Sequence, residues 1–494
     1  MTALAALVAL LPLAGGAAAL AGTRAKVAGW VTVLGAVGAL AAAVALTVRV
    51  VTGAPARGLG GYLYVDPLAG FFLMTVALVV VLAALGSAAY LRVEERREAL
   101  SSFQVRLYFV GFGLFAAMML ASMETGNLGL LWVLVEASTL ASAVLVALEA
   151  RPTSLEAAWK YIIISSFGVT IALVGTLFLF YSASALPLGA AQRLTWPALF
   201  ASAGALRPDS LRLAFLLAVI GYGTKVGLAP MHTWLPDAHA EAPSPASAML
   251  SAALLNTGMY AIVRFRGITS AGLGVGYTSR VLLVLGFLSI GVGVLFMIRQ
   301  RNFKRLYAYS SIEHMGIVAA ALGFGGALGL YGALLHTLNH AVAKAVAFLA
   351  SGDVVLRHGT RSAHRLHGTL VGAPAFGGAL LLASVALLGS PPFGLFLSEL
   401  TIVRAGFQRA NPLLPALLLM LLVVAFVALL HTIAGMVLGA GSADPPRPSP
   451  YPAAAVRVLA VVPLVAGLVL LLVLGLWIPH ALDNLILRST EVIR

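Results

Sequence analysis

The stretch GYGTKVGLAPMHTWLPDAH, residues 221–239, interrupts a long apolar run with one lysine, Lys225, and two prolines, Pro230 and Pro236. A proline inside a helix removes a hydrogen bond and clashes with the preceding turn, at about 3 kcal/mol or more. Placing a charged lysine at the centre of a membrane-spanning helix also costs about 2.5–3.5 kcal/mol of insertion free energy. The stretch therefore predicts a broken helix that holds a charge in protein or beside water, away from lipid.

The rest of the chain has the composition of a membrane protein. Of its 494 residues, 61% are hydrophobic and 10% are charged, and its mean hydropathy is +1.01. A hydrocarbon layer needs about 20 apolar residues per helical span, and the apolar runs are continuous, which favours a helical bundle over a β-barrel. Fourteen spans are predicted, at 1–22, 27–51, 66–91, 105–122, 127–149, 156–182, 211–235, 244–268, 278–299, 305–325, 329–350, 370–408, 412–439 and 454–478.

The net charge of +14 is concentrated in loops, so we interpret it as a determinant of membrane orientation and not as a nucleic-acid surface. Odd-numbered loops carry more lysine and arginine than even-numbered ones, which predicts odd loops in the cytoplasm and both termini outside. The first stretch lacks a basic start, and the apolar pattern resumes after Arg24 and Lys26, so we expect a retained helix and not a signal peptide. The absence of cysteine excludes disulfides and a cysteine-ligated iron–sulfur cluster.

A second interrupted stretch, LLGSPPFGLFLSEL (387–400), places Gly389, Pro391 and Pro392 before Glu399. The two broken spans are the seventh and the twelfth, and matched interruptions indicate an internal repeat with a midplane site. We therefore predict an all-α polytopic fold in which spans 4–8 and 9–13 are repeats. Five is an odd number of spans, so the second copy is inverted. The predicted units are 1–104 (spans 1–3), 105–268 (spans 4–8), 278–439 (spans 9–13) and 453–494 (span 14), with a proline-rich linker at 441–452.

Ionisable residues recur within the predicted spans. In LLHTLNHAVAKAVAF, His336, His340 and Lys344 recur every four residues, which places them on one helical face about 6 Å apart along the axis. Imidazole titrates near pH 6.5, and burial lowers the pKa of lysine, so such a column predicts a hydrated proton relay. The other candidate pathway residues are Glu136, Lys160, Lys225, His232 and Glu399, with Glu313, His314, His239 and His431 as possible additions.

Several of these residues have a structural alternative. A lone histidine on a helix is more often a hydrogen-bonded structural residue, and we favour that interpretation for His431. Lys160 lies near the start of its span and fits equally well a side chain that reaches back to the interface. Glu313 and His314 are adjacent, so they point to different faces and one of them can simply pack. The histidines of HTWLPDAH (232–239) flank prolines and a turn, which weighs against a metal site, and we expect no metal or cofactor in this chain.

Three motifs carry a family resemblance. TKVGLAPMHTWLPDAHAEAPSPASAMLSAALLNTGMYAIVRF (224–265), RNFKRLYAYSSIEHMG (301–316) and HAVAKAVAFLASG (340–352) resemble the antiporter-like proton-pumping subunits of respiratory complex I, of multisubunit Na+/H+ antiporters and of group-four membrane-bound hydrogenases. YSSIEHMG, LLNTGMYAIVRF and GSPPFGLFLSE look most like the hydrogenase-4 and formate-hydrogenlyase type of subunit.

The resemblance implies roles for individual residues. Glu136 resembles the glutamate that pairs with the broken-helix lysine, here Lys225, and Glu399 occupies the ionisable position of the twelfth helix. Lys344 and the histidines before it fall in the relay of the eleventh helix. The family often has LLKT in the eighth helix, whereas this chain has LLNT with Asn256, which can hold water but not charge. The link between the two half-channels then runs through water on Asn256, or through the two histidines of the relay.

These features predict a non-redox subunit that moves protons in a prokaryotic cytoplasmic membrane. The expected partners are other membrane subunits and a peripheral redox module of hydrogenase or NADH dehydrogenase type. A subunit of a Na+ or K+/proton antiporter is the alternative, although aspartate is absent from the predicted span centres. A bicarbonate-uptake subunit and a purely structural anchor also stay open. Identification of co-purified subunits discriminates between them.

Overall fold

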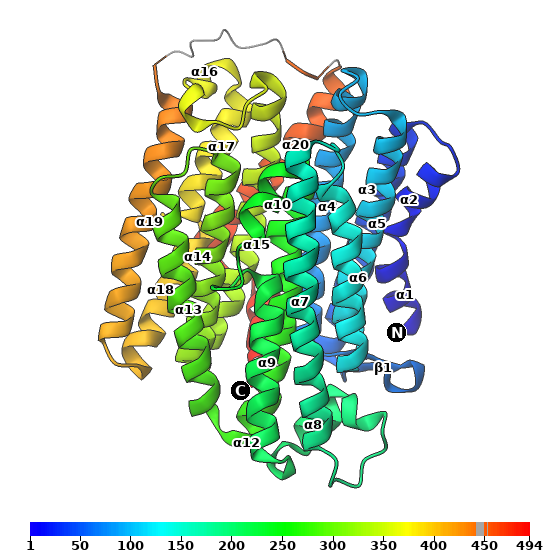
Figure 1. The fold of residues 1–494 in the computed structure, drawn as a ribbon, viewed down its shortest axis with the longest axis vertical. Coiled ribbons are helices and arrows are strands. Elements are labelled where there is room, and N and C mark those ends of the chain that lie inside the picture. The colour runs from blue at the N-terminus through cyan, green and yellow to red at the C-terminus, as the bar shows by residue number, and fades with distance from the viewer. Residues whose placement is uncertain (441–448, 452) are drawn as a thin grey trace.

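The computed structural model describes residues 1–440, 449–451 and 453–494, so the predicted proline-rich linker at 441–452 lies almost wholly outside the described residues. In the described part of the chain, long helices run side by side in one bundle (Figure 1). A small antiparallel hairpin, in a predicted loop, pairs β1 (Ala56–Gly58) with β2 (Leu63–Val65). Its turn contains Gly60 and Gly61, both with positive φ.

The first predicted span is a bent pair of helices and not one continuous helix. α1 (Thr2–Leu10) and α2 (Leu13–Leu20) meet at an angle of 50°. Pro12 directly precedes α2 and has no N–H to donate to the turn before it, which accounts for the interruption. The next elements are α3 (Ala25–Thr52), α4 (Pro67–Arg96), α5 (Ser102–Glu124), α6 (Leu128–Val146), α7 (Pro152–Ser182) and α8 (Trp196–Ala201).

The first predicted break is present. α9 (Pro208–Val226) ends at Gly227, whose φ of 78° is in the left-handed region, and turns containing Pro230 lead to α10 (Leu235–Glu241). The predicted span 244–268 is subdivided, because α11 (Ser244–Met249) and α12 (Leu255–Leu273) are joined by a π-helical turn at Leu250–Leu254. π turns are frequent at functional sites.

The second break is also present, between α17 (Pro374–Leu387) and α18 (Gly394–Arg409), where Gly389 has a φ of 59° and is followed by the two prolines. A C-terminal helix, α21 (His480–Ile493), was not predicted and packs against α4, α12 and α15 (Gly326–His358). The elements of this half are α13 (Val275–Met297), α14 (Phe303–Phe324), α15 (Gly326–His358), α16 (Thr369–Gly372), α17 (Pro374–Leu387), α18 (Gly394–Arg409), α19 (Leu413–Leu438), α20 (Ala454–Leu476) and α21 (His480–Ile493).

The prediction of a helical membrane protein with many spans is confirmed. Among the described residues, ten helices are long and apolar enough to cross a membrane, or eleven if the bent α1–α2 pair is one span. The number of helices that meet this criterion of length and hydropathy is lower than the fourteen predicted spans. α9 and α14 are not among the ten, and both are rich in polar residues: α9 carries Asp209, Arg212 and Lys225, and α14 carries Glu313 and His314.

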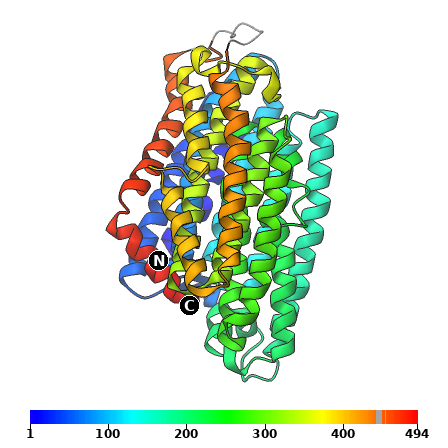
Figure 2. The ribbon, with the colours of Figure 1, turned by 90° about the vertical axis from the view of Figure 1, so that its left-hand side faces the viewer.

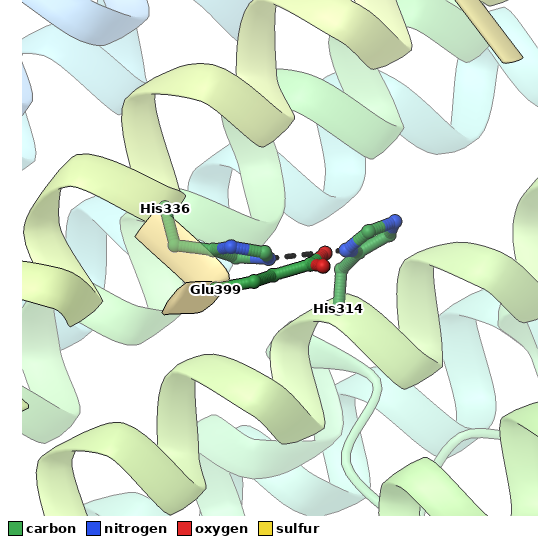
Figure 3. A group of neighbouring side chains, drawn as sticks. All are labelled: His314, His336 and Glu399. Atoms are coloured by element: carbon green, nitrogen blue, oxygen red, sulfur yellow. Dashed lines mark hydrogen bonds between the residues drawn. The ribbon is translucent and has the colours of Figure 1, made fainter. Parts of the chain in front are cut away.

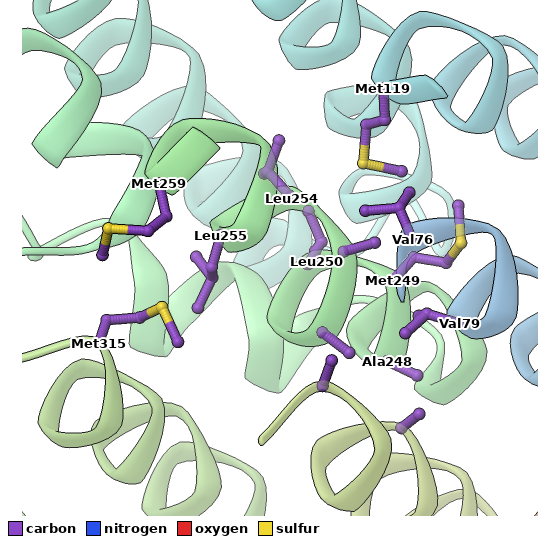
Figure 4. Close-up of a cluster of buried hydrophobic side chains, with 14 of the residues drawn as sticks. Val76, Val79, Met119, Ala248, Met249, Leu250, Leu254, Leu255, Met259 and Met315 are labelled. Atoms are coloured by element: carbon purple, nitrogen blue, oxygen red, sulfur yellow. The ribbon is translucent and has the colours of Figure 1, made fainter. Parts of the chain in front are cut away.

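Burial separates central from peripheral helices. The apolar windows of the α11–α12 segment and of α15 are wholly buried, whereas those of α13, α19 and α20 are between 22% and 39% buried. The peripheral α19 lies on the outside of the bundle in both views (Figures 1 and 2). Near the centre, apolar side chains of α4, α5, α12 and α14 pack together, among them Val76, Met119, Leu255 and Met315 (Figure 4). Helices shielded from lipid in this way can carry ions.

Candidate functional site

Lys225 lies in the last turn of α9, two residues before Gly227 ends that helix. Its side chain is fully buried. The ammonium donates hydrogen bonds to the hydroxyls of Thr139 and, at 3.5 Å, Tyr161, and it lies 4.9 Å from the centre of the Tyr161 ring. A cation at the carbonyl end of a helix is also stabilised by the helix dipole, so the break in the helix provides part of the site.

Glu136 is half-buried on α6. One carboxylate oxygen accepts a hydrogen bond from Ser166 at 2.5 Å, and the other accepts one from Thr139 at 3.2 Å. Thr139 therefore contacts both Glu136 and Lys225, and no direct ion pair between these two is among those of the described residues. Because a hydroxyl donates and accepts at once, Thr139 couples the two charges.

Asn256 follows the π turn near the start of α12, and its side chain is fully buried. Its amide nitrogen donates to Ala252 O at 2.8 Å, whereas its amide oxygen has no hydrogen-bond partner. Ser251, within the π turn, hydrogen-bonds Ser311 of α14 at 2.8 Å. Buried polar atoms without a protein partner are where ordered water binds, so this segment connects the two halves through polar groups.

Three buried histidines meet in the second half, and we call His314, His336 and His340 the histidine cluster. His314 Nδ1 lies 3.0 Å from His336 Nε2, and the rings of His314 and His340 are 5.1 Å apart. His336 Nδ1 lies 3.0 Å from the hydroxyl of Ser398 on α18. Neither ring nitrogen of His340 has a hydrogen-bond partner. His314, predicted only as a possible addition, is the residue that contacts both others.

Lys344, one turn after His340, is fully buried. Its ammonium donates to Ser310 Oγ and to Tyr307 O, both at 2.7 Å. Glu313 is buried as well, and its carboxylate lies 3.9 Å from His314 Nε2. The polar contacts of Lys344 therefore come from the same helix, α14, that contributes His314 to the histidine cluster.

Glu399 is half-buried on α18, directly beside the second break. A Cβ on Gly389 would lie 1.9 Å from its Oε2, so a larger residue there would displace the carboxylate from this position. Glu399 and Glu313 line one small cavity between α14, α18 and α19. Glu399 also lines a larger apolar groove of about 280 Å3 against α19.

His314, His336 and Glu399 are also the set among the described residues with the spacing to hold a metal ion. One ligand atom from each lies within 4.8 Å of the others, and the side chains of His336 and Glu399 point toward His314 (Figure 3). The two nearest imidazole nitrogens already face each other at hydrogen-bond distance.

Four predicted residues lie apart from these groups. The side chain of Lys160 is 45% exposed and forms ion pairs with Glu156 at 2.6 Å and with Asp237 at 3.2 Å. His431 is exposed on α19. His239 is buried, with Nδ1 2.7 Å from Leu235 O and the ring beside Phe348, and His232 lies in the break with its ring 6.5 Å from that of Phe296.

Two charge networks were not singled out from the sequence. Asp66 and Arg264 form a buried ion pair with two 2.7 Å contacts. Arg361 forms an ion pair at 2.7 Å with Glu241, the last residue of α10, and lies 3.5 Å from Glu149. Burial lowers the pKa of the Arg361 guanidinium, but the carboxylate of Glu241, followed by that of Glu149, raises it above its ordinary value. Both networks join residues far apart in sequence, so no spacing pattern indicates them.

The segment that contains both broken helices matches a family of known proteins. Residues 125–437, more than half of the chain, match the model described as NADH:quinone oxidoreductase/Mrp antiporter, TM. The chain belongs to this family. The resemblance inferred from the three motifs is therefore confirmed.

The similar proteins include hydrogenase-4 components. The chain is 38% identical over 372 residues to a hydrogenase-4 component F homolog of Methylacidiphilum infernorum, covering 75% of this chain and 78% of that protein. It is 30% identical to hydrogenase-4 component B of Escherichia coli, covering 68% of this chain but only 50% of that protein. NADH-quinone oxidoreductase subunit N of Desulforudis audaxviator is 33% identical, over 67% of this chain and 63% of that one.

Solved structures share the whole fold. A chain of the archaeal membrane-bound sulfane sulfur reductase has a TM-score of 0.84 at 25% identity, covering 99% of this chain and 97% of its own. A chain of respiratory complex I from Thermus thermophilus with bound NADH has a TM-score of 0.81 at 23% identity, covering 99% of each chain. A chain of the Mrp complex from Dietzia has a TM-score of 0.81 at 21% identity, covering 100% and 97%. The last two establish the fold alone.

Proposed function

We propose that this chain is a proton-translocating membrane subunit, without redox chemistry of its own, of a complex related to membrane-bound hydrogenases or respiratory complex I. The observation that carries the proposal is the burial of the side chains of Lys225, Lys344 and the histidine cluster within the helical bundle. Ionisable groups at this depth are expensive and are kept for function. Relatives named as hydrogenase-4 components and as an NADH-quinone oxidoreductase subunit support the class.

The proposed path starts at the first broken helix, where a proton from the cytoplasm loads Lys225. It continues through water held at Asn256, whose amide oxygen has no protein partner, and past the Ser251–Ser311 contact to Lys344. From Lys344 it passes His340 and the rest of the histidine cluster, and it leaves by way of Glu399. Each of these groups is titratable or binds water, which is what a relay of protons requires.

The proposed driving element is Glu136. It is half-buried, so a neighbouring subunit has access to its carboxylate, and it reaches Lys225 through Thr139. A change in its charge or position alters the stability of the protonated lysine, because a nearby carboxylate favours the ammonium. Protonation at Lys225 then follows events in the partner.

We further propose the finer architecture that the sequence predicts. It comprises fourteen spans, with two inverted five-helix repeats in the units 105–268 and 278–439, flanked by the units 1–104 and 453–494. Two left-handed glycines, Gly227 and Gly389, at corresponding breaks support the repeat. The proposed location is a prokaryotic cytoplasmic membrane with odd loops inside and both termini outside, and the proposed partners are other membrane subunits and a peripheral redox module.

A subunit of a Na+ or K+/proton antiporter is the second candidate. The shared cavity of Glu313 and Glu399 favours it, since hard cations prefer oxygen ligands. The adjoining histidine cluster supplies nitrogen instead, which suits protons better. Sodium-dependent transport by the purified single chain would support this candidate over the first.

The test is proton pumping by the intact complex in proteoliposomes, with the subunit carrying Lys225→Ala. The expected result is an assembled complex whose pumping is lost. Lys26→Ala, an exposed lysine on the same chain, is the matched control and should pump normally. Unchanged pumping by Lys225→Ala would refute the proposal, and identification of the co-purified subunits selects the type of complex.

A further inference from the structure

A cavity of about 500 Å3 opens at the end of the bundle where α12, α14 and α18 end and α13, α15 and α19 begin. The C-terminus lies at this end (Figure 1). Three arginines line the cavity, Arg266, Arg409 and Arg494, and its apolar wall includes Val275 and Leu414. No aspartate or glutamate is among the lining residues in the described part of the chain.

Two neighbouring arginines on α12 differ in how their charge is compensated. Arg264 and Arg266 are each only 2% exposed. Arg264 has a bidentate partner in Asp66 and a further contact to Tyr260. Arg266 donates only to the backbone carbonyl of Ile493, at 3.1 Å, and its Nε is buried without a partner. A buried guanidinium without an anion is strongly unfavourable, and no ion pair of Arg266 is among those of the described residues.

The turn between α14 and α15 brings a second arginine to the same place. Gly325 and Gly326 both have positive φ, and a Cβ on Gly326 would lie 1.9 Å from Arg409 Nη1. A Cβ on Gly325 would lie 3.6 Å from Arg266 Nη2. The two guanidinium groups therefore flank one turn, and among the described residues neither forms an ion pair.

We propose that this cavity binds the phosphate of an anionic phospholipid headgroup. Guanidinium groups bind phosphate oxygens in a bidentate manner, and basic pockets between membrane-spanning helices recognise anionic headgroups. Val275, which is 52% exposed, and Leu413, 73% exposed beside Leu414, offer apolar surface for the acyl chains at the cavity mouth. The site is independent of the proton path, because none of the proposed path residues lines the cavity.

The test measures lipid retention and thermal unfolding of the purified full-length chain in nanodiscs of phosphatidylglycerol or of phosphatidylcholine. The test variant is Arg409→Gln, because that arginine is exposed, lines the cavity, and has no side-chain hydrogen bond among those of the described residues. Arg280→Gln is the matched control, since Arg280 is exposed on α13 near the same end of the bundle and does not line the cavity. A third arm adds inorganic phosphate to wild-type protein in detergent.

The expected result is that phosphatidylglycerol raises the unfolding temperature of the wild type and is retained in native mass spectrometry. Arg409→Gln should bind it about tenfold more weakly, through the loss of a charge-assisted hydrogen bond, and Arg280→Gln should behave as the wild type. Equal retention by Arg409→Gln and wild type would overturn the proposal. If inorganic phosphate raises the unfolding temperature as much as phosphatidylglycerol does, the ligand is a free anion and the assignment to a lipid is overturned.

Discussion

The sites around Lys225 and around His340 use similar residues but differ in how their polar atoms are satisfied. The ammonium of Lys225 has two hydroxyl partners, and both oxygens of Glu136 accept hydrogen bonds. In contrast, both ring nitrogens of His340 and the side chain of the neighbouring Asn339 lack partners. Since unsatisfied buried groups are unfavourable without water, the first site works through side-chain hydroxyls and the second requires water.

This difference shows that buried charge alone does not describe a relay. The first site couples two ions through one hydroxyl and is suited to passing on a change of charge. The second gathers titratable groups from α14, α15 and α18 around unsatisfied atoms and is suited to moving protons. The variants below are expected to affect the two sites differently.

Among these further variants, His340→Leu is expected to have the largest effect. The substitution removes a titratable group that makes no hydrogen bond to protein, so pumping should fall by about a hundredfold, the scale of a lost acid–base group, with little change in unfolding temperature. His431→Leu, on the exposed face of α19, is the control and should pump normally. Both are measured as proton uptake in proteoliposomes. Normal pumping by His340→Leu would mean that the second site is a packing feature.

Thr139→Val should have the next largest effect. Valine keeps the shape of threonine but removes the hydroxyl that bridges Glu136 and Lys225, and we expect about tenfold slower pumping from the loss of roughly one hydrogen bond to a charged group. Thr139→Ser should restore the rate. If the serine variant is as slow as the valine variant, the bridge is not the coupling element.

A smaller effect is expected at the second break from Gly389→Ala. The added Cβ would clash with Glu399 Oε2, and the φ of 59° disfavours alanine, so the unfolding free energy should fall by about 1 kcal/mol and pumping by a few-fold. Gly276→Ala, with open space around it, is the control. Equal stability and pumping in both variants would show that Glu399 does not depend on Gly389 for its position.

The smallest effect is expected from Lys160→Ala. This lysine is half-exposed and paired at the surface, and exposed ion pairs contribute little. Pumping should change by less than about twofold. A loss of pumping as large as that of Thr139→Val would show instead that Lys160 belongs to the proton pathway, as the sequence predicted.

Local sequence patterns predicted the two helix breaks and the shared helical face, because both depend only on neighbouring residues. The prolines after Lys225 and before Glu399 predicted both breaks, because a proline in a helix interior removes a hydrogen bond and clashes with the preceding turn. The four-residue spacing of His336, His340 and Lys344 likewise predicted a shared helical face.

Contacts between distant helices were not predictable in this way. Thr139 and Ser398 are ordinary helix residues until another helix brings a titratable side chain to them. Asp66 meets Arg264 from 198 positions away. The π turn at Leu250–Leu254 also lacks a periodic signal. The helix α21 does carry one, because Leu485, Ile486 and Ile493 recur at helical spacing on its buried face, and that pattern could have predicted it. One sequence and its spacing give no access to such tertiary pairings.

The central claim is that water connects the buried ions, and a high-resolution map of the intact complex tests it most directly. The account predicts ordered water within hydrogen-bond distance of Asn256 Oδ1 and of both His340 ring nitrogens, in a continuous chain from Lys225 toward Lys344. Tight apolar packing between Lys225 and Lys344, with no water at Asn256 or His340, would contradict it.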